Sequence, residues 1–221
     1  MKEKNINGYI FQLYKKDTYD TPQVIKKSAD FLRFMEKRRS VTGFSDKYVP
    51  REVIENLVLT ASTAPSGGHK QPWTFCAVSN NDIKLGIRLE AEKAEKEIHQ
   101  DPGAEVWLKE MYPLQPIADK SFLETAPWLI VVSKQKGLPQ EIFHVTESLG
   151  IASGMLLTAI HNAGLVAMTH GISSPQTIKA MLGRPANEEP FLVIAVGYPG
   201  EECYVPKLIR KGLKDIAVFY E

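Results

Sequence analysis

Arg38, Arg39 and Ser40 stand together near the end of the first predicted helix. Two guanidinium groups and a hydroxyl offer several hydrogen-bond donors to a single phosphate, which makes this triplet a candidate phosphate site. The same residues would also suit a solvated helix end, because cations are favoured near the negative end of the helix dipole. From the triplet alone, both interpretations stay open.

A loop with two adjacent glycines follows the second predicted helix, in the sequence Ala64-Pro65-Ser66-Gly67-Gly68-His69. Without side chains at two positions, a flat ligand can approach the backbone, and free N–H groups can bind an oxyanion. An ordinary turn has the same composition and remains the alternative.

Glu95 and His99 lie four residues apart, on one face of a predicted helix. They suit the ammonium and carboxylate of a ligand, or simply form part of a solvated face.

The five histidines show no metal-ligand spacing, and no Ser-His-Asp signature or Walker-type loop is present, so no metal is expected. Cys76 and Cys203 are the only cysteines, which indicates a reducing compartment without a disulfide framework.

Alternating helices and strands must position these residues. Helical spacing predicts helices over residues 21 to about 39, from Arg51 to the break at Pro65, over 82–99 and over 141–163, with shorter helical pieces in 104–124. Apolar runs predict strands at 73–78, 128–133, 165–168 and 191–196. In the first helix we expect four side chains to face inward, those of Ile25, Phe31, Leu32 and Met35. The pattern indicates one sheet wrapped by helices, of the α/β or α+β class.

Composition narrows the partners of this chain of 221 residues. Its 27 Lys+Arg balance 26 Asp+Glu, so neither nucleic acid nor an acidic membrane surface is an expected partner. Purely apolar runs such as Trp128–Val132 are far shorter than a membrane span, and the first five residues do not resemble a secretory signal. We therefore expect a cytoplasmic protein.

The second half of the 141–163 helix is apolar on almost every face, which is typical of a central helix or a subunit interface.

In this order, the motifs resemble those of the nitroreductase superfamily of FMN enzymes, and within it the iodotyrosine deiodinase branch. The resemblance covers roughly residues 22 to 220, and its most specific part is the block Thr63–Phe75. The matching segments are Arg38–Val41, Thr63–Phe75, Asn162–Leu165, Leu182–Glu188 and Val196–Pro199.

The resemblance implies an α+β, nitroreductase-like fold in which helices wrap a central, mostly antiparallel sheet. It also implies a domain-swapped homodimer with two FMN molecules at the interface. We accordingly expect an N-terminal arm over residues 1–21 and an FMN-binding domain over 22–221. Within that domain we expect a lid at about 88–124 and a C-terminal dimer-exchange tail at about 203–221.

The resemblance also assigns cofactor contacts to three groups of residues. Those implied for the FMN phosphate and ribityl chain are Arg38, Arg39, Ser40 and Arg210. Those implied along the isoalloxazine are Pro65, Ser66 and Gly67, and those at the flavin edge that includes N5 are Thr169, His170 and Gly171. Thr42 stands near the pyrimidine side, where the branch has an arginine; losing that cation lowers the expected flavin potential.

For the substrate, the branch clamps an amino-acid zwitterion over the flavin and binds the phenolate on a backbone N–H. The matching clamp residues in this chain are Glu95, His99 and Lys120, with Gly68 supplying the N–H. Glu95 and Lys120 complement an ammonium and a carboxylate. His99 replaces a tyrosine of the branch. Gly171 replaces a threonine whose hydroxyl is associated with one-electron flavin chemistry, so only a backbone N–H remains to act at N5, as in ordinary nitroreductases.

These residues lead to three functional hypotheses. The first is an FMN-dependent oxidoreductase that reductively dehalogenates a halotyrosine or halophenol, with FMN reduced by NAD(P)H or a partner reductase. The second is an NAD(P)H-dependent nitroreductase or quinone-type reductase, which Gly171 favours. The third is a non-catalytic flavin or aromatic-amino-acid binding protein.

Overall fold

The computed structural model describes residues 2–111 and 119–221, and its internal contacts divide the chain into two units. The first unit ends at Arg38, and the second runs from Arg39 to Glu221. Seven residues of the expected lid, 112–118, lie outside the described part of the chain.

The first unit contains a hairpin and one helix. Strands β1 (Glu3–Ile6) and β2 (Tyr9–Gln12) pair in antiparallel fashion across a turn at Asn7 and Gly8. Both turn residues have positive φ, 53° and 87°, as a two-residue hairpin loop requires. No strand is expected in this arm from the apolar runs, although Asn-Gly between apolar residues is a strong hairpin signal.

Helix α1 (Thr21–Glu36) begins where it is predicted and ends three residues early. Asp20 caps it by accepting from the Gln23 N–H. The expected inward orientation of its apolar side is wrong within this unit. Ile25, Phe31 and Leu32 are exposed and Met35 is only half-buried, because a two-stranded hairpin and a single helix leave no core for them to enter.

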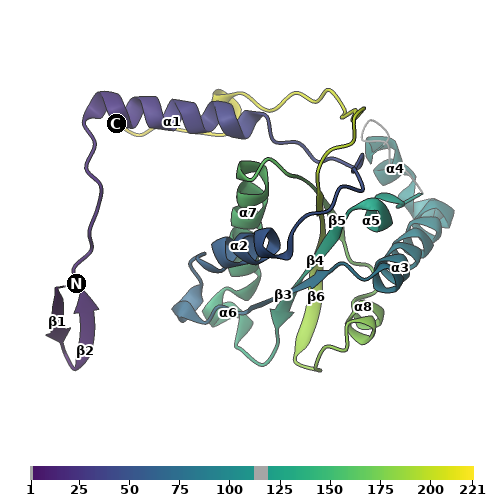
Figure 1. Ribbon diagram of the computed structural model, residues 1–221, viewed down its shortest axis with the longest axis horizontal. Helices are drawn as coiled ribbons and strands as arrows, with labels where there is room; N and C mark the ends of the chain where they lie inside the picture. Colours follow the sequence, from purple (N-terminus) through teal and green to yellow (C-terminus); the bar gives the residue numbers. More distant parts are fainter. Residues whose placement is uncertain (1, 112–118) are drawn as a thin grey trace. The chain divides into compact units, whose positions relative to one another are not determined.

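The second unit is built around a four-stranded sheet in the order β3-β4-β6-β5, with every neighbouring pair antiparallel (Figure 1). Its strands are β3 (Trp73–Val78), β4 (Trp128–Gln135), β5 (Val166–Gly171) and β6 (Glu188–Gly197). This confirms the α+β class and the antiparallel sheet. β4 and β6 extend beyond the predicted 128–133 and 191–196 because Lys134 and Gln135 pair with Glu189 and Glu188.

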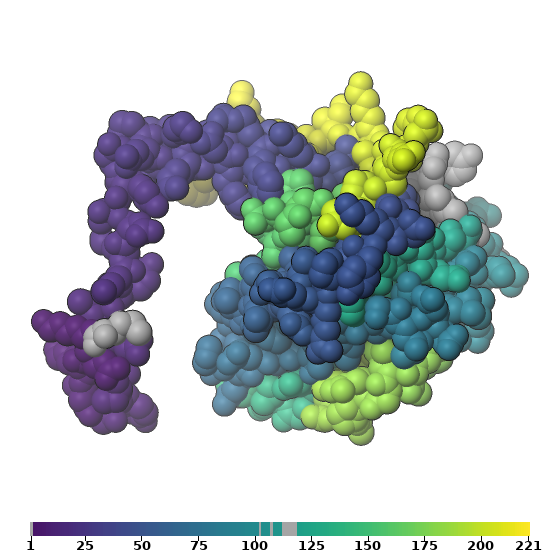
Figure 2. All heavy atoms as spheres, viewed as in Figure 1, coloured from purple at the N-terminus to yellow at the C-terminus, as the bar shows by residue number. Residues whose placement is uncertain are grey.

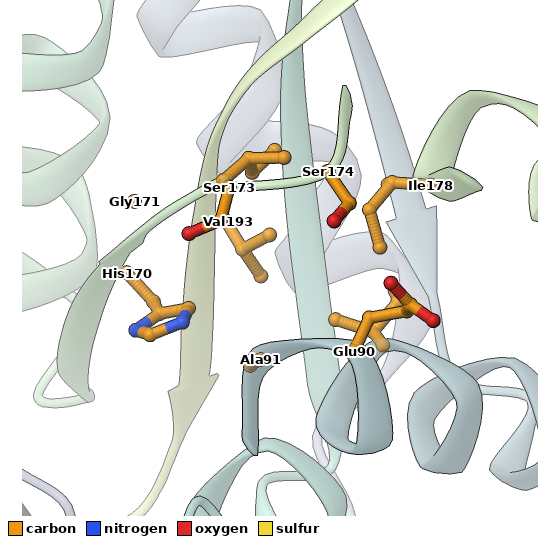
Figure 3. Close-up of a pocket in the computed structure, with 10 residues that line it drawn as sticks. Glu90, Ala91, His170, Gly171, Ser173, Ser174, Ile178 and Val193 are labelled. Atoms are coloured by element: carbon orange, nitrogen blue, oxygen red, sulfur yellow. The ribbon is translucent and has the colours of Figure 1, made fainter. Parts of the chain in front are cut away.

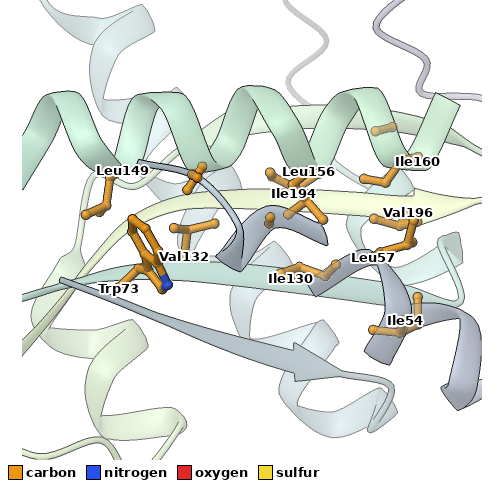
Figure 4. Packing of buried hydrophobic residues seen from close by; sticks show 14 of the residues in the cluster. Ile54, Leu57, Trp73, Ile130, Val132, Leu149, Leu156, Ile160, Ile194 and Val196 are labelled. Carbon is orange, nitrogen blue, oxygen red and sulfur yellow. The ribbon is translucent and has the colours of Figure 1, made fainter. Parts of the chain in front are cut away.

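One face of the sheet is covered by α2 (Arg51–Ser62) and α7 (Val145–Asn162). Figure 4 shows Leu149, Leu156 and Ile160 of α7 directed at the sheet, where Ile194 and Val196 are among the side chains that meet them. Burial of these side chains removes apolar surface from water and stabilises the unit. The cluster that they form is the larger of the two hydrophobic cores among the described residues. The core fixes α7, which in turn supports the glycine loop.

The other face is covered by α3 (Asn81–Gln100), α5 (Phe122–Thr125) and α8 (Pro175–Met181), over a second core. A short 3₁₀ turn, Pro102–Ala104, and α4 (Glu105–Met111) follow α3 along the chain. The short helical pieces expected in 104–124 are therefore present where the chain is described. In the space-filling view, the atoms of α2, α3 and α8 belong to one continuous body (Figure 2).

The long helix predicted over 141–163 is interrupted. A short α6 (Gln140–Phe143) ends at His144, whose φ of 46° is left-handed, and α7 starts at the next residue. The stretch Gln140–Asn162 is long and apolar enough to span a membrane by length and composition alone. Its apolar side nevertheless packs in the core against the sheet and α2, as the central helix of a globular protein does.

Candidate functional site

β5 forms an edge of the sheet, and its outer side carries backbone groups available to a ligand. The Ser40 segment bridges it near Ala167, whose carbonyl accepts the Val41 N–H at 3.0 Å. Successive residues of a strand direct their backbone groups to opposite sides. Ala167 points outward, so Thr169 and Gly171 also point outward, while His170 points toward β6. The N–H of Gly171 therefore faces the open edge, where the family resemblance requires a donor.

Space is available at Gly171. A Cβ added to this exposed residue would meet no atom of the described residues within 4 Å, so the space beside its Cα is open. A pocket adjoins it on the side of α3 and α8 (Figure 3). Its lining consists of Ile87, Glu90, Ala91, His170, Gly171, Ile172, Ser173, Ser174, Ile178 and Val193.

Two of the residues expected at the phosphate, Arg39 and Ser40, lie near the other end of the same strand edge. Ser40 is exposed beside Ala167, and the guanidinium of Arg39 donates to the carbonyl of Pro206, which brings the C-terminal tail beside it. Thr42 follows, half-buried. Arg38 is the last residue of the first unit, and Arg210 lies further along the tail. The structure thus brings Arg39, Ser40 and the tail together.

The glycine loop is held against the start of α7. The N–H of Gly67 donates to Ser148 Oγ at 3.3 Å, and that hydroxyl donates to the His144 carbonyl at 2.7 Å. A Cβ on Gly67 would lie 2.1 Å from the Phe143 carbonyl oxygen, so only glycine fits at this position. Gly68 has a φ of 55° and lies against the Phe143 ring.

Sequence reasoning missed Ser148, because its contact with the loop depends on how α6 and α7 pack. The Pro65–Ser66 part of the loop is held by a hydrogen bond between residues close in the chain. Exposed Pro65 leads into Ser66, whose hydroxyl accepts the Gln71 N–H at 2.9 Å.

Topology brings this loop and Gly171 to the same end of the unit. β5 starts only four residues after α7 ends and packs against it, so the strand runs back along the helix. The last residue of β5 therefore lies toward the start of α7, where Ser148 holds the loop. Both features belong to the face of the sheet that α7 covers.

Glu95 and Lys120 form a buried ion pair on the opposite face. Lys120 Nζ lies 3.2 Å from Glu95 Oε2, and the two residues, Lys120 and Glu95, are only 8% and 7% exposed. His99 Nε2 lies 3.5 Å from Glu95 Oε1, and that oxygen is buried and has no hydrogen-bond partner within residues 2–111 and 119–221. The structure thus unites the three residues of the expected clamp. A buried carboxylate oxygen without a donor is costly and can accept the ammonium of a ligand.

His170 connects this cluster to Gly171. Its ring meets that of Phe122 edge-on, with centroids 6.3 Å apart. Burial lowers the pKa of His170, and the charge of Lys120 lowers it further, against an opposing effect of Glu95. The His170 side chain is therefore mostly neutral at pH 7. It lies on the face of the sheet that α3 covers, with Glu95 and Lys120, while its neighbours Thr169 and Gly171 face the other side.

Comparison with known proteins places these motifs in a family. The Nitroreductase family model matches residues 35–198, well over half of the chain. The chain belongs to the nitroreductase family. The iodotyrosine deiodinase of Haliscomenobacter hydrossis is 47% identical over 208 residues, which cover 91% of this chain and 94% of that protein. Iodotyrosine deiodinase 1 of Homo sapiens is 38% identical over 207 residues, covering 90% of this chain and 72% of that protein.

A solved structure of similar fold supports the same branch of the nitroreductase family. It is oxidised iodotyrosine deiodinase bound to FMN and 3-iodo-L-tyrosine, with a TM-score of 0.72 and 27% identity. The match covers 86% of this chain and 98% of that one. Within the nitroreductase family, this chain is therefore of the iodotyrosine deiodinase-like branch.

The lowered pKa of His170 predicts a pH-dependent stability. Below the ordinary histidine pKa of about 6.5, the unfolded chain binds a proton that the folded chain does not. The free energy of unfolding therefore decreases as the pH is lowered. We expect His170→Gln to lose less stability than the parent protein between about pH 7.5 and 5.5 in urea unfolding. His69→Gln, at an exposed histidine, is the matched control. An unchanged pH slope in His170→Gln would contradict the prediction.

Proposed function

We propose that this protein is an FMN-dependent oxidoreductase that removes halogen reductively from a halotyrosine or halophenol. Its deiodinase relatives support the reaction class. The observation that carries the substrate is the buried pair of Glu95 and Lys120 beside His170 and Gly171, because it offers opposite charges next to the proposed flavin edge.

The residues along the β5 edge fit FMN. Arg39 and Ser40 supply donors for a phosphate near Ala167, and the Gly171 N–H faces outward four residues later, about 13 Å along the strand. FMN carries its phosphate and its ring at opposite ends of the ribityl chain, and the open space at Gly171 suits the ring. In this proposal Arg38 and Arg210 add to the phosphate contacts, Thr42 lies near the pyrimidine side, and Pro65, Ser66 and Gly67 follow the ring.

Reduced FMN supplies the electrons when bound; the residues of the chain bind and orient the substrate. In this proposal Glu95 accepts the ammonium of the amino acid, Lys120 and His99 donate to its carboxylate, and the Gly68 N–H holds the phenolate. Two electrons and one proton replace the halogen, which leaves as halide. The ligand takes its place between Glu95 and Lys120, and so exchanges one buried ion pair for two.

A nitroreductase or quinone-type reductase is the second candidate, and Gly171 favours it. With no hydroxyl at this position, the backbone N–H is the donor that residue 171 offers to the flavin edge. Either function requires a source of electrons, and we propose NAD(P)H or a partner reductase.

We also propose a homodimer that works in the cytoplasm. Its support is apolar surface that one chain leaves open. Ile25, Phe31 and Leu32 of α1 are exposed, as is Ile151 on the outer side of α7. A second copy of the chain would remove such surface from water.

Reoxidation of the reduced flavin separates the candidate functions. With FMN reduced anaerobically by dithionite, we expect iodotyrosine to reoxidise the holoenzyme and to yield tyrosine and iodide in equal amounts. Reoxidation by a nitroaromatic alone would contradict dehalogenation and support the second candidate. Binding without turnover of either compound would support a non-catalytic binding protein.

The clamp predicts a change in ligand preference. Glu95→Gln removes the charge that attracts the ammonium, and we expect it to raise the dissociation constant of iodotyrosine at least tenfold. The constant for 2-iodophenol, which has no ammonium, should change little in calorimetric titrations of the oxidised holoenzyme. Glu97→Gln, at an exposed position of the same helix, is the control. Equal effects on both ligands would reject the clamp.

The proposed dimer predicts the mass of two chains in light scattering. Leu32→Glu puts a charge into the apolar side of α1 and is expected to shift the mass toward one chain at low concentration. Lys26→Glu, on the same helix at a side chain that is 76% exposed, should leave the mass unchanged. A mass of one chain for the parent protein would refute the dimer.

A further inference from the structure

Four charged residues of α3, spaced three or four positions apart, form a row that faces residues 119–126. They are Lys84, Arg88, Glu92 and Glu95. At one end of the row Lys84, itself buried, donates from Nζ to the carbonyls of Glu124 and Ala126 at 2.8 and 3.0 Å. The proposed clamp uses only Glu95 at the other end, which leaves the residues between without an assigned role.

Arg88 binds three carboxylates from both sides of this contact. Its guanidinium lies 2.8 Å from Glu92 on α3, 2.8 Å from Glu124 on α5 and 3.3 Å from Asp119. Hydrogen bonds to Glu92 and Glu124 raise the pKa of Arg88, so its positive charge is fixed at any physiological pH. Arg88 thus joins the helix to the segment that carries Lys120.

Glu92 takes part in a second contact, with the backbone of Lys120. The carboxylate oxygen that accepts from Arg88 Nε also accepts the Lys120 N–H, at 3.0 Å. Three residues further along the same helix, Glu95 receives the Lys120 ammonium at 3.2 Å. Two carboxylates therefore hold one lysine, one at its backbone and the other at the tip of its side chain.

From this arrangement we propose that Glu92 is a positioning residue for substrate recognition. It holds the Lys120 backbone so that the ammonium stays beside Glu95, ready for the carboxylate of an amino-acid substrate. Glu92 touches the substrate at no point, and Arg88 orients its carboxylate. The inference rests on the proposed function, because it assigns Lys120 the carboxylate of the ligand.

The energetic reason is the burial of Lys120, which is 8% exposed. Without the oxygen of Glu92, its N–H would lose its acceptor within a mostly buried environment, and the backbone would shift toward other partners or water. A shift of about 1 Å is enough to separate a charged pair from its ligand, because positioning of binding groups is steeply dependent on distance. The dissociation constant of a ligand without a carboxylate would not change with this shift.

The test compares two ligands on the FMN-loaded protein. Glu92→Ala is expected to raise the dissociation constant of 3-iodotyrosine about tenfold and that of 2-iodophenol less than about twofold, the first value matching the loss of one charge-assisted hydrogen bond. Glu92→Gln keeps an oxygen that can accept the Lys120 N–H, and is expected to recover most of the affinity. Glu97→Ala removes the same charge from an exposed position of α3 and serves as the control.

The outcomes separate the two proposals. A parent protein that binds the two ligands equally well would refute the zwitterion clamp, and with it the role of Glu92. A parent protein that prefers iodotyrosine, together with a Glu92→Ala variant that keeps this preference, would overturn the role of Glu92 alone.

Glu92→Gln keeps the shape of the side chain and applies the same test if Glu92→Ala does not fold. Full loss of the preference for iodotyrosine in this variant, without change in iodophenol binding, would assign the role to the charge of Glu92 rather than to its acceptor oxygen. That result would overturn positioning through the Lys120 N–H.

Discussion

Antiparallel pairing between β5 and β6 fixes which groups of residues 166–171 reach each face of the sheet. With Ala167 bonded outward to Val41, the register puts the backbone groups of Thr169 and Gly171 on the open edge and the His170 side chain on the α3 face. A slip of one residue would exchange the two faces and move the His170 side chain away from the α3 face. The proposed flavin edge and the proposed clamp are therefore held next to each other by one strand.

Buried charge accounts for the arrangement on the α3 face. Glu95 and Lys120 are costly to remove from water, and their attraction offsets that cost only when the geometry is held. Arg88, Glu92 and the carbonyls bonded to Lys84 hold it from both sides. Such a pair, in which one carboxylate oxygen has no donor in the part of the chain that the structure describes, suits a ligand that brings both charges, as an amino acid does.

The departures that the family resemblance implies, at residues 42 and 171, bear on the proposed flavin chemistry rather than on substrate binding. Gly171 offers a backbone N–H in place of a hydroxyl, and Thr42 offers no cation near the proposed pyrimidine side. In the proposed function these positions act on the flavin, while Glu95, Lys120 and His99 act on the substrate. The two groups of residues can therefore change independently, and recognition of an amino acid does not by itself determine how electrons are transferred.

The sequence by itself determined several elements of the second unit and the family. Apolar runs gave β3 at its observed bounds, helical spacing gave α2 and α3 closely, and the Thr63–Phe75 block indicated the nitroreductase family that the comparisons confirm. These features depend on residues near one another in the chain. It also named Glu95, His99 and Lys120, which the structure unites. Only the tertiary structure decided the rest. It set the break between α6 and α7 at His144. It also set the hydrogen bond of Gly67 to Ser148 and the contacts of Lys120 with Glu92 and Glu95. These contacts join segments that are distant in the chain, and a local sequence pattern does not encode them.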